Sequence, residues 1–290
     1  MNENNYILNI KRGYLREDFI FFNLKEKKQL EFEFHYHDFN KIVIFISGKV
    51  TYLIEGKAYE LKPWDILFVS RNEVHKPLID SKETYERIVI WINSKFVEKH
   101  NTEDSNLMTC FELVCSQKCS LLRLNPELLI NIKYTMSQLE TACKDNEFGN
   151  HVLRNALFLQ VLVYLNRLAL KNQNNNRNND IKYDENIDKI LNYINKNINS
   201  DLSLNKISDK FYMSKYHLMH KFKKYTGYTI HNYIVQKRII MANNLIKDGK
   251  PITEACFDCG FGDYSSFLKA FKKIFGIPPK QYYKTLKELE

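Results

Sequence analysis

The C-terminal part of the sequence contains one twelve-residue pattern twice. FKKYTGYTIHNY begins at Phe222 and FKKIFGIPPKQY begins at Phe271, so the copies stand 49 positions apart. Each copy follows a short helical segment, a tight turn and a residue that can cap a helix, Ser214 in the first copy and Asp263 in the second. Two short helices joined by a tight turn form a helix-turn-helix. The repeat therefore predicts two such units in tandem.

Residues 181–290 have the pattern of an all-helical domain. After a first amphipathic helix, Ser203 is expected to cap a second helix that ends near Phe211. Ser214 is expected to cap a third helix, which a left-handed Gly227 closes. A long fourth helix follows, and then the pattern repeats.

The positive charge of the chain is concentrated in this same region. Residues 181–290 hold 19 Lys and Arg against 11 Asp and Glu, a net charge of +8, whereas residues 1–180 contribute only +1 of the total +9. A protein that neutralises DNA phosphates needs such a surplus. The charge distribution therefore favours a nucleic-acid partner for the C-terminal domain.

Residues upstream predict a second, β-rich domain. Short runs of β-branched and aromatic residues at 41–46, 49–54, 65–69 and 87–92 indicate an antiparallel sandwich or small barrel. Apolar residues then follow a helical period over 126–170, which predicts a helical pair.

The fold class predicted from these patterns is α+β multidomain. The polar run KNQNNNRNND (171–180) reads as a linker. We therefore expect a β-rich domain (1–125), a helical dimerisation segment (126–170), the linker and a helical domain (181–290).

The second repeat resembles the AraC/XylS family of bacterial transcription regulators. The segment ITEACFDCGFGDYSSFLKAFKKIFGIPPKQYYK (252–284) is similar to the family signature at Ile252, Gly260, Phe261, Asp263, Ser265, Phe267, Phe271, Lys272, Gly276, Pro279 and Tyr282. It departs from that signature at Cys256, Gly262 and Pro278. Gly262 removes a capping hydroxyl and leaves that role to Asp263.

A looser resemblance links residues 34–75 to the cupin-like sensory domain of the same family. His35 and His37 fall in the first cupin motif, and His75 closes the second. Metal-binding cupins place a Glu where this chain has Lys41, and the family often has Gly at Trp64. Because a cation repels a metal ion, Lys41 argues against a metal centre, and no cofactor is expected.

Helical phase separates buried residues from those that face DNA. Leu218 and Phe222, like Phe267 and Phe271, are spaced four apart and should be core. The resemblance implies DNA contacts by the opposite face and the helix starts, at Ser214, Lys215, Tyr216, Met219, His220, Lys223, Asp263, Tyr264, Ser265, Leu268, Lys269 and Lys272. Lys269 and Ser265 suit base edges, Met219 and Leu268 suit thymine methyl groups, and the flanking lysines, Lys221, Lys224 and Lys273 included, suit phosphates.

Six aromatic or imidazole residues in the β-rich domain are candidates for effector binding. They can hydrogen-bond and stack on a sugar or similar small polar ligand: His35, His37, Tyr52, Trp64, His75 and Trp91. Half of them are expected to be core, and alternation along 87–92 leaves the orientation of Trp91 open. The class of ligand is implied by the family resemblance.

The resemblance implies a transcription regulator with double-stranded DNA and a small-molecule effector as partners, and RNA polymerase as a further partner. An activator is expected, with a repressor as the open alternative. A homodimer is expected through the apolar stripe Leu153, Leu157, Val161 and Leu165, although the stripe can instead pack on its own barrel. No apolar run is long enough to cross a membrane, and no secretion signal is recognised, so a cytoplasmic protein is expected.

Two other functional classes compete with a sequence-specific regulator. A metal-dependent cupin enzyme would need the carboxylate that Lys41 replaces, and a sequence-neutral architectural DNA binder would need a vestigial sensory domain. The cysteines of the Cys256-x-x-Cys259 pair are interpreted as small buried apolar residues, with a thiol redox sensor as the alternative.

The tandem repeat and its charge predict that residues 181–290 alone bind DNA. Two recognition helices on one chain should enter successive major grooves about 34 Å apart. Footprinting of the purified fragment on a regulated promoter should show two protected groove segments. Protection of a single segment, or of none, contradicts the tandem arrangement.

Overall fold

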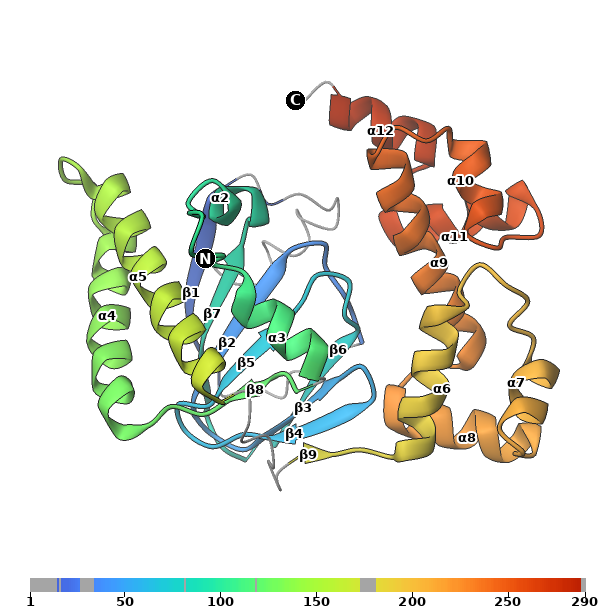
Figure 1. Cartoon of the computed structure of the whole chain (residues 1–290), viewed down its shortest axis with the longest axis horizontal. Helices are drawn as coiled ribbons and strands as arrows, with labels where there is room; N and C mark the ends of the chain where they lie inside the picture. The colour runs from blue at the N-terminus through green and yellow to red at the C-terminus, as the bar shows by residue number, and fades with distance from the viewer. Residues whose placement is uncertain are drawn as a thin grey trace. The chain divides into compact units, whose positions relative to one another are not determined.

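The computed structural model describes residues 15, 17–26, 34–80, 82–117, 119–172 and 181–287. These form two compact units: the first holds the described residues up to Ile181 except 55–57, and the second holds residues 55–57 and 182–287 (Figure 1). Most of the predicted linker, residues 173–180, lies outside the described residues, so the exact segmentation stays a prediction.

The first unit is built on two antiparallel sheets. The larger sheet has the spatial order β1 (Phe19–Glu26), β7 (Tyr85–Ile92), β2 (Asn40–Ser47), β5 (Ile66–Val69) and β8 (Leu121–Leu122). The smaller sheet has the order β6 (His75–Ile79), β3 (Val50–Ile54), β4 (Lys57–Glu60) and β9 (Ile181–Lys182). The expected β-rich domain is confirmed, but over the described residues its strands form two separate sheets and not a closed barrel.

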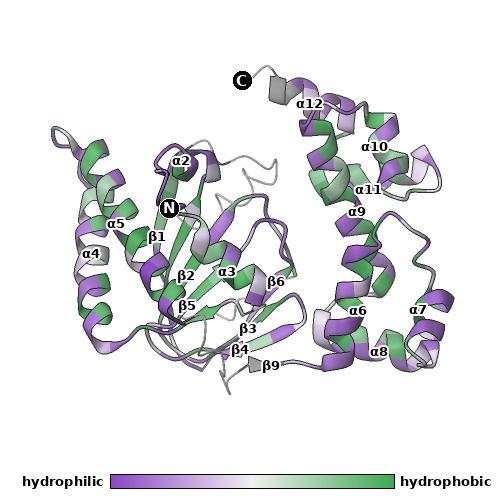
Figure 2. Ribbon diagram, viewed as in Figure 1, coloured by the Kyte–Doolittle hydropathy of each residue, from purple (hydrophilic) through white to green (hydrophobic). Residues whose placement is uncertain are grey.

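Strand β2 lies at the centre of the larger sheet, and its residues 40–45 are buried whichever face they point to. Successive side chains of a strand point to opposite faces. Ile42 and Ile44 share one face with Ile90 of β7, and this face packs into the core with the helices of the unit. Lys41 and Val43 therefore point to the other face, where Lys41 stands opposite Trp91 in the register. The strands β2 and β5 are accordingly among the most hydrophobic segments of the unit (Figure 2).

Four helices complete the first unit: α2 (Ser94–Glu98), α3 (Thr109–Gln117), α4 (Pro126–Lys144) and α5 (Asn150–Lys171). Helices α4 and α5 are the predicted helical pair and lie side by side (Figure 1). Asn166 on α5 ties it to the segment at α3, because its amide accepts from the Cys110 N–H at 2.7 Å and donates to the Leu107 carbonyl at 2.8 Å.

The apolar stripe of α5 does not form the expected dimer surface. Leu157, Val161 and Leu165 are buried within this chain, in the core that α5 shares with the larger sheet. Only Leu153, 53% exposed, is open to solvent. The alternative interpretation of the stripe is therefore confirmed: it packs on the sheet of its own chain. The amphipathic helix covers an apolar sheet face there.

The second unit is all helical, as predicted. Its helices are α6 (Glu185–Lys196), α7 (Leu204–Lys210), α8 (Lys215–Thr226), α9 (Ile230–Lys247), α10 (Ile252–Asp258), α11 (Tyr264–Phe275) and α12 (Pro279–Lys287). Ser203 and Ser214 cap α7 and α8, and Gly227 closes α8 in the left-handed region with φ +75°. Within the described residues, no helix is both long and apolar enough to cross a bilayer.

The corrected role of the α5 stripe predicts unequal effects of two leucine truncations one turn apart. Leu157→Ala should lower the free energy of unfolding of the first unit by about 2 to 5 kcal/mol, because it opens a cavity in the core. Leu153→Ala should cost less than about 1 kcal/mol, because Leu153 is exposed. Denaturant unfolding measures both variants, and equal effects would contradict this packing.

Candidate nucleic-acid interface and effector site

The first helix-turn-helix consists of α7, a turn and α8. The turn places Tyr212 in the left-handed region with φ +51°, and the Met213 N–H donates to the Ser208 carbonyl at 3.0 Å. The Ser214 hydroxyl then accepts from the His217 N–H at 3.3 Å and starts α8. Local hydrogen bonds therefore set the angle at which the recognition helix leaves the turn.

The second helix-turn-helix repeats this construction in α10 and α11. Gly260 turns the chain with φ +83°, and a Cβ there would lie 2.8 Å from the Asn199 carbonyl oxygen, so no larger side chain fits. The Asp263 carboxylate accepts from the Ser266 N–H at 2.7 Å and from its hydroxyl at 2.8 Å. Asp263 is thus the cap that the sequence predicted in the absence of a hydroxyl at Gly262. These bonds, with a smaller contribution from the Lys269 charge, lower the pKa of Asp263.

The predicted core face of both recognition helices is confirmed. Leu218, Phe222, Phe267 and Phe271 are all fully buried. Cys256 and Cys259 belong to the same core as Phe267 and Phe271. Burial raises the pKa of the Cys259 thiol to about 12, which keeps it protonated at neutral pH. The structure therefore favours the packing interpretation of this pair over a redox sensor.

The opposite face of α8 is open to solvent along its whole length. All the residues predicted to contact DNA on this helix and its cap are exposed: Ser214, Lys215, Tyr216, Met219, His220 and Lys223. The rings of Tyr216 and His220 stand nearly parallel, 6.3 Å apart between centroids. Lys221 differs, because its ammonium lies 2.8 Å from the Asp184 carboxylate. This ion pair with the residue that caps α6 competes with the phosphate contact expected of Lys221, which stays a prediction.

On α11 the predicted contact residues divide into two groups. Asp263, Ser265, Lys269 and Lys272 are exposed. Tyr264 and Leu268 are partly buried and pack on the core of the second helix-turn-helix. Only part of each of these two side chains is available to a ligand.

Five of the six effector candidates form one cluster in the first unit. The imidazole of His75 lies 4.3 Å from that of His35 and 4.8 Å from that of His37, between ring centroids. Tyr52 stacks at 6.2 Å from His75, and Phe39 bridges His37 to Trp91. The orientation of Trp91, open from the sequence, is thereby settled: it lies on the Lys41 side of the larger sheet.

Trp64 lies apart from this cluster. It packs on the helix-covered core, with the Lys133 ammonium of α4 4.9 Å from its ring centroid. Its backbone has φ +69°, a conformation that favours glycine, which agrees with the Gly expected there from the family resemblance. Trp64 therefore lies outside the cluster formed by the other five effector candidates.

The two central histidines present hydrogen-bond acceptors. The Nδ1 of His37 lies 2.7 Å from the Phe39 carbonyl, and the Nδ1 of His75 lies 2.9 Å from the Glu73 carbonyl. A carbonyl only accepts, so both Nδ1 atoms carry the proton and each Nε2 of the neutral rings is left as an acceptor. Both Nε2 atoms are buried without a hydrogen-bond partner among the described residues.

Lys41 also belongs to this site, although its position in the sequence was used only as an argument against a metal centre. Its side chain is buried, and its charge interacts with both His37 and His75. Burial first, and neighbouring charges including Lys41 second, hold the pKa of both imidazoles well below the usual value. Alternation along β2 was the available signal, because it places Lys41 on the face of Val43. No group of three His, Cys, Asp or Glu in the described part of the chain has the geometry to hold a metal ion.

Comparison with known proteins adds two family matches. Residues 25–162 match the AraC-like ligand binding domain, and residues 207–285 match a helix-turn-helix domain. The first match spans the histidine cluster, and the second spans both recognition helices.

Curated relatives match along most of the chain. The HTH-type transcriptional activator RhaR of Mannheimia succiniciproducens is 25% identical over 88% of this chain and 88% of its own length. The HTH-type transcriptional activator RhaS of Enterobacter sp. (strain 638) is 24% identical over 87% and 88%. Among solved structures, the C-terminal domain of the response regulator YesN from Fusobacterium nucleatum is 31% identical over 34% of this chain and 98% of that one, with a TM-score of 0.33.

Proposed function

The chain belongs to the AraC/XylS family of transcription regulators, and from this premise we propose how it reads DNA and what it senses. The observation that carries the proposal is the pair of capped recognition helices, each with one face in the core and the other exposed. Under this proposal the chain activates transcription at specific sites and is neither an enzyme nor a sequence-neutral binder.

Base contacts are assigned to the exposed middle of each recognition helix. On α8 these are Tyr216, Met219 and His220, and on α11 they are Ser265 and Lys269, with Tyr264 and Leu268 contributing only their exposed edges. Lys215, Lys223 and Lys272 are assigned to phosphates, beside the caps Ser214 and Asp263. The repeat offset pairs Met219 with Leu268 and His220 with Lys269. Because the paired side chains differ chemically, the two half-sites differ in base sequence.

The effector site is assigned to the cluster of His35, His37, Tyr52, His75 and Trp91. The acceptor Nε2 atoms of His37 and His75 favour a ligand that supplies hydrogen-bond donors, as the hydroxyls of a sugar or similar polyol do. The aromatic rings of Tyr52 and Trp91 supply the apolar faces on which such a ring packs. The Lys41 cation disfavours a metal ion at the same place.

The remaining partners follow from the same premise. A homodimer is proposed through the exposed side of the helical pair, where Ile130, Tyr134, Val152 and Leu153 are all more than half exposed. RNA polymerase is the partner that an activator bound at a promoter needs, and the cytoplasm is where a bacterial promoter lies. Sedimentation of the Leu153→Ala variant described above, with Val152→Ala added, tests the dimer surface by a shift to the monomer mass.

Two lysines of α11 separate base readout from phosphate binding. Lys269→Ala should weaken binding to the cognate site by about 1 to 3 kcal/mol and leave random DNA nearly unaffected, because a base contact is lost. Lys272→Ala should weaken both DNAs alike and lower the salt slope by about one unit. Titration of both variants against both DNAs at several salt concentrations measures this. Uniform weakening by Lys269→Ala would refute the proposed orientation of α11.

The effector assignment is tested by removing one acceptor. Thermal unfolding of the wild type with a panel of monosaccharides and polyols should identify a stabilising compound, since a ligand at 100 times its Kd adds about 2.7 kcal/mol. His75→Phe should abolish that stabilisation, because the ring is kept and the Nε2 acceptor is lost. His100→Phe is the control, because His100 also bonds a carbonyl through Nδ1 but is exposed. Stabilisation that survives in His75→Phe contradicts the site.

A further inference from the structure

The second unit contains a hollow of about 770 Å³ beside the first recognition helix. Its walls are the loop between α6 and α7 (199–203), the exposed face of α8, the first turns of α9 and the turn at Gly260. Ligand sites for small organic molecules have volumes of about 300 to 1,000 Å³. The hollow is thus large enough for a compound of drug size.

The floor of the hollow is apolar. Leu202, Ile230 and Ile234 line it and are nearly buried, and Met219, 45% exposed, lines it as well. Such a surface gains free energy when an apolar group displaces water from it. A DNA backbone suits cations but offers the floor no apolar group of this size.

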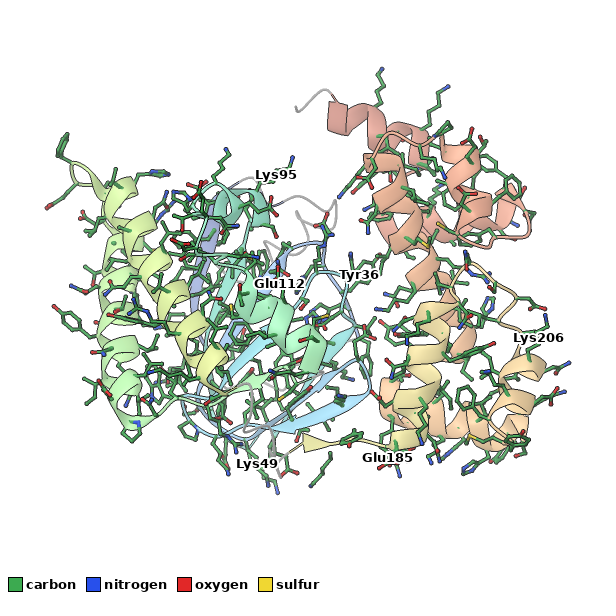
Figure 3. All side chains as sticks on the ribbon, viewed as in Figure 1. Tyr36, Lys49, Lys95, Glu112, Glu185 and Lys206 are labelled. Carbon is green, nitrogen blue, oxygen red and sulfur yellow. The ribbon has the colours of Figure 1, made fainter. Side chains whose placement is uncertain are left out.

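The rim of the hollow is basic. His220 and Lys223 come from α8, and His231 and Arg238 come from α9. Asp201 is the one carboxylate among the described lining residues, and its oxygen lies 2.8 Å from the Lys206 ammonium. Lys206 stands on α7 at the outer side of the unit (Figure 3). The charge left over at the rim is positive, which favours an anionic ligand.

Hydrogen bonds within the chain hold the walls of the hollow in place before any ligand binds. The Arg238 guanidinium donates to the Ile198 carbonyl at 2.9 Å and to the Ser200 carbonyl at 2.7 Å. Gly260 packs against the Asn199 carbonyl so closely that a Cβ would clash. A preformed wall lowers the cost of ordering on binding.

We propose that this hollow binds a small amphipathic organic anion with an aromatic ring, and that the bound anion excludes DNA. The ring packs on the apolar floor beside Tyr216, and the anionic group lies at Lys223 and His231. The exclusion rests on the proposed function, because Tyr216, Met219 and His220 line the hollow and are also assigned to base contacts. Such a ligand acts directly on the recognition helix and does not require the effector cluster.

The probe is 8-anilinonaphthalene-1-sulfonate, an aromatic sulfonate whose fluorescence rises on binding to apolar surface. Titrated into the folded full-length chain without DNA, it should bind Lys223→Glu about tenfold more weakly than the wild type, because a charge-assisted contact is reversed. Met219→Ala should also weaken binding, through the floor. Lys224→Glu is the matched control, because it makes the same charge change on an exposed neighbour outside the hollow.

Equal affinity of the probe for Lys223→Glu and Lys224→Glu would overturn the proposal. In the wild type, the apparent Kd for operator DNA should rise in proportion to probe concentration above the probe's own Kd. Failure of the probe to displace DNA would overturn the exclusion. Probe binding is measured without DNA, so the two proposals can fail separately. If the chain binds the probe as described but does not prefer any DNA sequence, only the proposed function is contradicted.

Discussion

The burial of two side chains spaced four residues apart on each recognition helix is the constraint on which the exposed face of both helix-turn-helix units depends. Leu218 and Phe222 hold α8 by one face, and Phe267 and Phe271 hold α11 in the same way. Once these positions are in the core, helical geometry leaves the opposite face exposed. Left-handed Gly227 and Gly276 then end both helices at the same point of the repeat. The lysines of the last turn also interact favourably with the helix dipole, whether or not DNA is bound.

Equivalent buried positions anchor both copies of the repeat, but their outer faces differ. Ser214 and Asp263 cap equivalent helices with different groups, a neutral hydroxyl and a carboxylate. Met219 is exposed, but its counterpart Leu268 packs partly on the core of the second helix-turn-helix. A duplicated scaffold with divergent outer residues is suited to reading two different base sequences in one binding event, as the proposed function requires.

In the first unit the corresponding constraint is the alternation of β2. Its even-numbered residues lie in the core that α4 and α5 cover, and its odd-numbered residues place Lys41 on the face of Trp91. Polar groups buried away from water cost free energy unless they are hydrogen-bonded. Each of the two central histidines offsets this cost at Nδ1 through a backbone carbonyl and keeps Nε2 available. The interior of the sheet domain thereby retains two buried acceptors that have no hydrogen-bond partner among the described residues.

The sequence by itself determined the features that depend on neighbours within a few residues: the helix caps at Ser203, Ser214 and Asp263, the left-handed turn at Gly227, and the buried face of each recognition helix. The two-domain order and the β-rich character of the first unit followed from periodicity. Features that depend on contacts between residues far apart in the sequence were decided only by the tertiary structure. It buried the Leu157 stripe against its own sheet, paired Lys221 with Asp184, and separated Trp64 from the histidines while adding Lys41 to them. Periodicity specifies which face of an element is apolar, but the partner that covers this face is set by residues far away in the sequence.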